Sequence, residues 1–164
     1  MATPTTLPAT FVAGNVLEAS QLNNLRGAFR VLQVVQATHS TQVSTTSTSY
    51  VTTGLNATIT PSATTSKILI YANVPCQGAT GQNMNITLFR GTVAGTDLAT
   101  GAQGFGIFAT GANTPVAPLS MFYLDSPSTT SAQTYTAGMK TTGGTIYAHV
   151  SATMGTMILM EISA

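Results

Sequence analysis

From residue 31 onward, the chain repeats short segments that are rich in β-branched residues and that alternate apolar with polar side chains. Turn-forming residues separate these segments, as in PSATTS (61–66), SPSTTS (126–131) and TTGG (141–144). Short strands that recur every 8–12 residues or so between such turns are typical of an all-β sandwich or barrel. No second helical pattern follows residue 30, which argues against βαβ units. We therefore expect an all-β, jelly-roll-like antiparallel β-sandwich.

The pattern predicts strands at residues 31–39, 48–54, 55–61, 67–74, 84–91, 104–110, 119–126, 132–140, 145–152 and 156–163. Residues 40–47 are mostly Ser and Thr, and we expect a polar edge or a turn there. The Gly-rich stretches GTVAGTD (91–97) and GAQGFG (101–106) lack the Lys and the following helix that a phosphate-binding loop needs, so we expect ordinary loops.

Several predicted strands carry apolar residues on both faces. In KILIYANV, Ile68 and Ile70 share one face, whereas Leu69 and Tyr71 share the other. Such strands are buried on both sides in many proteins. One face would line the sandwich core and the other would contact a neighbouring subunit. A strand that is buried entirely within one chain is the alternative, and sequence does not separate the two.

The first 30 residues differ in composition from the rest. Pro and Gly in residues 1–16 predict an extended arm. Residues 17–29 place Leu22, Leu25 and Phe29 at spacings of three and four, which predicts one apolar face of a short helix. A helix of about three turns is marginal alone, so this face must pack on something. We expect an N-terminal attachment element at 1–30 and a β-sandwich domain at 31–164.

Charged residues make up only 5% of the chain, against about 25% in a typical soluble domain. Interface cores are likewise depleted of charge, which favours a component of an assembly over an isolated monomer. The net charge of +1 provides no basic surface for nucleic acid. The N-terminus does not resemble a signal peptide, and no apolar run is long enough to span a bilayer. We expect synthesis in a cytoplasm and no membrane partner.

The sequence offers little for catalysis. His39 and His149 fall in different predicted strands without other ligands at metal-binding spacing. The four carboxylates are each alone in their segments, and no nucleophile elbow is present. Cys76, the single cysteine, lies in an apolar run, and we expect it to be a small buried hydrophobe. We expect no enzymatic activity, no catalytic or metal-ligating residue, and no cofactor.

The stretch VLQVVQATHSTQVSTTSTSYVTTGLNATITPSATTSKILI resembles a module of virion proteins from tailed bacteriophages, including phages of cyanobacteria. Later pieces fit the same pattern in the same order: LFRG (88–91), MFYLDSPSTTSAQTY (121–135) and TMILMEISA (156–164). The N-terminal stretch ATFVAGNVLEASQLNNLRGAF resembles the leader of many phage tail-fibre and appendage proteins.

The resemblance implies a jelly-roll-like β-sandwich that forms homotrimers on the virion surface. Two functions fit it. The first is a capsid decoration (cement) protein that stabilises the shell, with the helix face of Leu22, Leu25 and Phe29 as the attachment or oligomerisation surface. The alternative is a tail-fibre or appendage protein that binds a host receptor, with loops 78–83, 91–97 and 111–118 contacting a glycan or protein. These loops contain no Tyr or Trp, which disfavours sugar binding through them.

Overall fold

The computed structural model describes residues 31–78, 80–109 and 115–163 of the chain. These residues form strands and one short 3-10 turn. The strands are β1 (Val31–His39), β2 (Val43–Thr45), β3 (Val51–Ile59), β4 (Lys67–Gly78), β5 (Asn83–Arg90), β6 (Thr96–Asp97), β7 (Gly106–Ala109), β8 (Ala117–Asp125), β9 (Gln133–Thr141), β10 (Ile146–Ala148) and β11 (Gly155–Ile162), and the turn η1 is Val150–Ala152.

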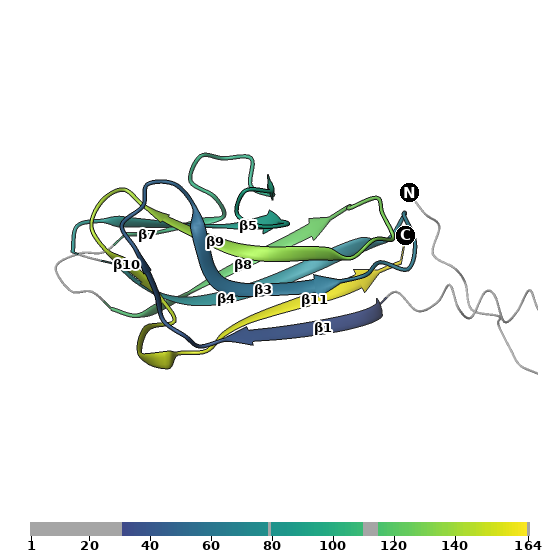
Figure 1. Cartoon of the computed structure of the whole chain (residues 1–164), viewed down its shortest axis with the longest axis horizontal. Coiled ribbons are helices and arrows are strands. Elements are labelled where there is room, and N and C mark those ends of the chain that lie inside the picture. Colours follow the sequence, from purple (N-terminus) through teal and green to yellow (C-terminus); the bar gives the residue numbers. More distant parts are fainter. Residues whose placement is uncertain (1–30, 79, 110–114, 164) are drawn as a thin grey trace, which may run out of the picture.

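Two antiparallel sheets pack face to face (Figure 1). In sheet A the long strands have the order β1-β11-β4-β8, because β11 and β8 pair with opposite edges of β4. In sheet B the order is β3-β9-β5-β7. The short strand β10 pairs with the last residues of β4, and β2 pairs with β10. In sheet B, β6 pairs with the end of β5. The long strands pass from one sheet to the other at every connection except β5 to β7, which is a jelly-roll arrangement.

The predicted all-β sandwich is therefore confirmed, and the strand at 31–39 has the predicted bounds. Three local predictions were wrong. The strand expected at 145–152 ends at Ala148, because His149, Ser151 and Ala152 adopt positive φ. Residues 48–54 and 55–61 are not two strands: β3 runs through both, because Gly54, at φ +88°, lies in a register shift that bends the strand without ending it. The expected turn at 40–47 contains β2, which the low apolar content concealed.

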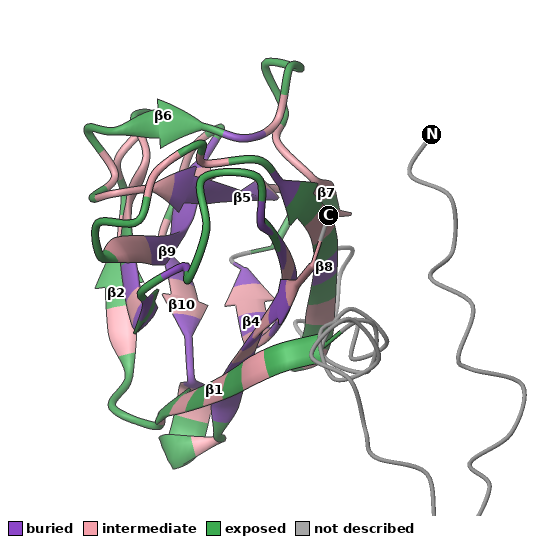
Figure 2. Cartoon of the chain, turned by 90° about the vertical axis from the view of Figure 1, so that its right-hand side faces the viewer, coloured by how far each residue is buried: buried purple, intermediate pink, exposed green. Residues whose placement is uncertain are grey.

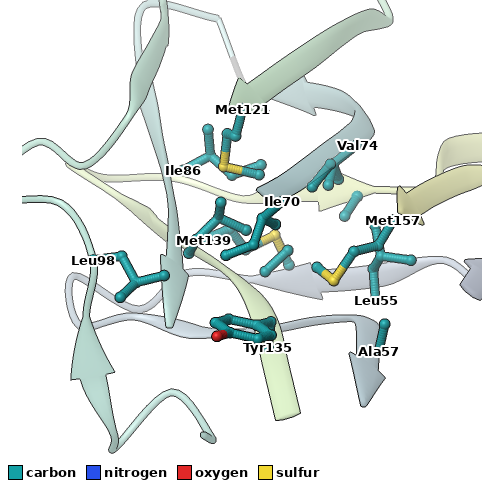
Figure 3. Packing of buried hydrophobic residues seen from close by; sticks show 14 of the residues in the cluster. Leu55, Ala57, Ile70, Val74, Ile86, Leu98, Met121, Tyr135, Met139 and Met157 are labelled. Carbon is teal, nitrogen blue, oxygen red and sulfur yellow. The ribbon is translucent and has the colours of Figure 1, made fainter. Parts of the chain in front are cut away.

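The core lies between the sheets and follows the alternation that the sequence predicts. Inward residues of β4 and β11 pack against inward residues of β3, β5 and β9 (Figure 3). The largest fully buried side chains include Tyr135, Leu55, Ile70, Ile86, Met139 and Met157. Burial of each such side chain contributes roughly 1.5–3 kcal/mol. Cys76 is also fully buried, which confirms its predicted role as a small core residue.

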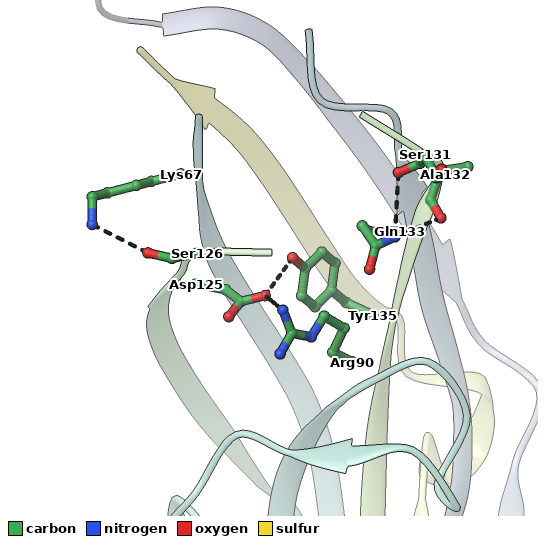
Figure 4. A network of polar contacts seen from close by, with 8 residues as sticks. All are labelled: Lys67, Arg90, Asp125, Ser126, Ser131, Ala132, Gln133 and Tyr135. Atoms are coloured by element: carbon green, nitrogen blue, oxygen red, sulfur yellow. Dashed lines mark hydrogen bonds and ion pairs between the residues drawn. The ribbon is translucent and has the colours of Figure 1, made fainter. Parts of the chain in front are cut away.

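Two carboxylates interrupt this apolar interior at one end of sheet A. Asp125 and Glu161 both pair in register with Ile68, one from each neighbouring strand. Asp125 accepts a hydrogen bond of 2.7 Å from the Tyr135 hydroxyl and lies 3.5 Å from the Arg90 guanidinium (Figure 4). Burial raises the pKa of Tyr135, and its hydrogen bond to Asp125 adds to this rise.

Glu161 is fully buried and has a different set of partners. One carboxylate oxygen accepts hydrogen bonds from the backbone N–H and hydroxyl of Ser62, at 2.7 and 2.6 Å, and from the Ser66 hydroxyl at 2.6 Å. The other oxygen accepts one from the Gln33 amide at 2.6 Å. Burial alone would raise the pKa of Glu161, but these hydrogen bonds outweigh it and lower the pKa to about 2. The carboxylate thus ties β1 and the loop before β4 to β11.

Candidate interaction surface

Sheet A carries apolar side chains on its outer face as well as its inner face. The pairing registers place Val34 opposite Met160, Met160 opposite Leu69, and Leu69 opposite Leu124. Residues paired in register point to the same face of a sheet. One uninterrupted apolar row therefore crosses all four long strands.

The next row continues this apolar surface over β11, β4 and β8, and Gln36 occupies its position on β1. Ile158 pairs with Tyr71, and Tyr71 pairs with Phe122. The Tyr71 and Phe122 rings contact each other, with centroids 4.8 Å apart and planes inclined by 44°. We define the outer apolar face as Val34, Leu69, Tyr71, Phe122, Leu124, Ile158, Met160 and Ile162. The sequence predicted this second face on β4 and β11, but not that the rows of four strands align.

Much of this face is open to solvent. Phe122 is 64% exposed, Val34 is 57% exposed and Leu124 is 49% exposed. The face ends at a polar row of Thr38, Thr156, Asn73 and Ser120. At the other end lies Lys67, whose ammonium donates a hydrogen bond of 3.1 Å to the Ser126 hydroxyl (Figure 4). Within the described ranges, Lys67 is the charged residue at its border, and the face itself carries no charge.

The size of the face follows from sheet geometry. Strands lie about 4.8 Å apart and alternate residues about 6.8 Å apart, so the eight residues of the outer apolar face cover about 260 Å². The largest apolar patch on a typical monomer covers about 300–600 Å² and is often functional, and this face approaches that range. The face is a candidate surface for contact with another protein.

The outer face of sheet B is different, because residues 91–105 fold across it. Figure 2 shows β6 and its flanking loops over β5 and β9, on the side of the molecule away from β1. The Thr87 hydroxyl donates a hydrogen bond of 2.6 Å to Asp97, which fixes this covering segment to β5. Two hollows of about 330 and 340 Å³ flank the segment. The two outer faces of the sandwich thus differ: one is flat and apolar, and the other is covered and polar.

The structure brings His39 and His149 together, although the sequence placed them in separate strands. Their ring centroids are 5.0 Å apart. His149 lies just beyond β10, is fully buried and adopts a left-handed backbone with φ 57°. Burial lowers the pKa of His149, and the neighbouring His39 lowers it further, while backbone groups of Thr153 and Thr53 oppose the change. Neither ring nitrogen of His149 makes a hydrogen bond of good geometry.

The predicted attachment residues Leu22, Leu25 and Phe29 lie outside the described residues. Among residues 31–78, 80–109 and 115–163, no three His, Cys, Asp or Glu side chains are grouped as metal ligands. Over the same ranges, none of the helical structure has the length and apolar character to cross a membrane.

No protein-family model matches the sequence, and no curated protein matches it. Among solved structures, the chain is similar to VP2 of infectious bursal disease virus in a subviral particle, with 15% identity and a TM-score of 0.44 over 80% of this chain and 32% of that chain. The Gx strain of the same virus gives 14% identity and a TM-score of 0.44, covering 37% of that chain. The T13 particle of the same virus gives 13% identity and a TM-score of 0.43, covering 36% of that chain. The chain spans about a third of the length of these structures.

Proposed function

We propose that this chain is a structural virion protein of a bacteriophage, and that it forms a homotrimer that binds and stabilises the capsid shell as a decoration (cement) protein. The observation that carries the proposal is the outer apolar face of sheet A. The sequence resemblance to modules of phage virion proteins supports a location in the virion of a bacteriophage. The β-sandwich, residues 31–164, supplies the contact between copies, and residues 1–30 attach the trimer to the major capsid protein or another virion protein.

The occupant of the outer apolar face is a second copy of this chain. The face has no charge with which to select a charged partner, and the chain itself presents the matching flat, uncharged surface. A standard interface buries about 800 Å² on each partner. The eight apolar residues supply about a third of that, and the polar row of Thr38, Thr156, Asn73 and Ser120 supplies a rim. In a cyclic trimer the three copies of this face would surround the three-fold axis, each in contact with both neighbours, and the face would leave water in every copy.

Shell stabilisation follows from mass action. A protein that binds the assembled shell but not its free subunits stabilises the shell by RT ln(1 + [L]/Kd) at each site. The expected apolar helix face of Leu22, Leu25 and Phe29 is the contact in this step, and three copies in one trimer raise the effective concentration of the arm.

The first experiment measures the oligomeric state. Phe122→Ser together with Leu124→Ser removes two exposed apolar side chains from the outer apolar face without touching the core. Met154→Ser is the matched control, because Met154 is 63% exposed but lies in the turn before β11. Light scattering coupled to gel filtration should give a trimer for the parent and the control, and a monomer for the double variant. A double variant that remains trimeric would rule out this face as the contact.

The second experiment tests the attachment element and the location. Changing Leu22, Leu25 and Phe29 to Ser should abolish incorporation into virions while the β-sandwich stays folded. Normal incorporation of this variant would show that the helix is not the anchor. Densitometry of purified virions measures the copy number relative to the major capsid protein.

A copy number typical of a tail would replace the decoration function with the alternative, a tail-fibre or appendage protein for host receptor binding. The two hollows beside residues 91–105 favour keeping this second candidate, because they lie on the face opposite to the proposed trimer contact.

A further inference from the structure

One of the two hollows on sheet B has a volume of about 330 Å³ and lies at the end of β5. Its walls come from four parts of the chain that are far apart in sequence. Asn85 on β5 pairs in register with Ile107 on β7 and with Lys140 on β9, so these three side chains form one row across the outer face. Thr48, Asn83, Ala102, Gln103, Thr141 and Thr142 complete the lining.

Asn85 is the central polar group of this hollow. It is 4% exposed, and its side-chain N–H donates a hydrogen bond of 3.2 Å to the Gln103 carbonyl. Its side-chain oxygen is buried and has no hydrogen-bond partner among the residues that the structure describes. A buried amide oxygen without a partner is unfavourable, so a hydroxyl or N–H donor from a ligand would supply the missing hydrogen bond.

Lys140 forms the second polar element. Its ammonium donates a hydrogen bond of 2.7 Å to the Ala102 carbonyl and lies 4.5 Å from the centre of the Tyr50 ring. These two contacts fix the ammonium beside Asn85, and an ammonium has three donors, so further donors remain for an acceptor. Ile107, which is 41% exposed, adds an aliphatic wall.

The lining decides the class of ligand. None of the described residues that line the hollow is a carboxylate, so these residues do not favour a hard cation. A single Lys is too little for a phosphate-rich ligand. An unmet acceptor, free ammonium donors, amide and hydroxyl groups, and one aliphatic wall match a molecule that alternates hydroxyl groups with C–H faces. We propose that this hollow binds a pyranose sugar unit, with Asn85 accepting from a sugar hydroxyl and Lys140 donating to a neighbouring oxygen.

This inference does not depend on the trimer, because the hollow lies on sheet B and the outer apolar face lies on sheet A. It also differs from the expectation that loop aromatics would be needed for sugar binding. The polar groups of this hollow, Asn85 and Lys140, lie on strands, and the Tyr50 ring contacts the Lys140 ammonium.

The experiment is a titration of the full-length protein, followed by two-dimensional NMR, with glucose, galactose, N-acetylglucosamine and glucuronic acid as separate probes. At least one probe should cause saturable shifts at residues 83–85, 102–107 and 140–142, with a Kd on the order of 1 mM. Asn85→Leu should weaken that binding about ten-fold, and Lys140→Met should do the same. If glucuronic acid alone causes saturable shifts, the proposal stands and the bound sugar carries a carboxylate that pairs with Lys140.

Asn56→Leu is the matched control. It removes the same amide from β3, beside the second hollow, and should leave binding unchanged. The proposal fails if none of the four probes gives saturable shifts. It also fails if the shifts gather at Thr52, Asn56 and Thr134, or if Asn85→Leu and Lys140→Met bind as tightly as the parent.

Discussion

Replacing Glu161 with Gln tests how one buried carboxylate holds three parts of the chain together. In the native protein the pKa of Glu161 falls from 4.5 to about 2, because the hydrogen bonds from Ser62, Ser66 and Gln33 outweigh its burial. At about 1.4 kcal/mol for each pKa unit, this difference corresponds to about 3 kcal/mol of unfolding free energy. A glutamine has the same shape, but it cannot ionise, and its amide N–H groups would face donors.

The sign of the pH dependence follows from the lowered pKa. A folded-state pKa below the unfolded value means that the unfolded chain binds the proton first as the pH falls. The contribution is therefore complete above pH 4.5 and is lost as the pH falls towards about 2. At pH 7 the Glu161→Gln variant should be less stable than the parent by about 3 kcal/mol. Near pH 2 the two proteins should have similar stability.

The assay is urea unfolding of both proteins at equal concentration between pH 2 and pH 7, followed by tyrosine fluorescence. Equal concentration matters because association also adds to the apparent stability. The reasoning is refuted if the difference between the two proteins stays constant over this pH range, because a constant difference means that the ionised form of Glu161 is not the one that the fold stabilises.

Two further predictions concern buried titratable groups. Because burial and His39 lower the pKa of His149 below 6.5, its contribution to stability is present above that pH and is lost as the pH falls through the folded-state pKa. His149→Asn, which tolerates the left-handed backbone, should flatten the stability curve between pH 5 and pH 7 in thermal unfolding; an unchanged curve would exclude His149 as its source. Burial also raises the pKa of Cys76, so the native thiol should react with a maleimide only as fast as the protein opens. A reaction rate equal to that of the unfolded chain would contradict the buried position of Cys76.

The sequence predicted the parts of the fold that depend on neighbouring residues. The alternation in residues 67–74 and 156–163 sorted the side chains of β4 and β11 into the same two faces that the structure has, without indicating which face lines the core. It failed where a strand bends, as at Gly54, and where a short strand is almost entirely polar, as in β2. Both depend on pairing with strands far away in sequence, and local patterns do not contain that information.

The candidate surfaces were predicted only in part. A second apolar face was visible in β4 and β11, but Phe122 and Val34 join it because the pairing registers align four strands. No pattern indicated that Asn85 and Lys140 share a hollow, or that Glu161 is a buried anchor. Each of these sites assembles from segments that are tens of residues apart.

A β-sandwich with few charges could be predicted from the amino-acid sequence, because strand period, turn residues and composition are properties of short segments. The folded structure was needed to show which outer face is apolar, which is covered and polar, and which side chains meet there. The physical reason is the pairing register: a shift of one residue would turn the side chains of a strand to the opposite face, and the register is fixed by the packed core as a whole.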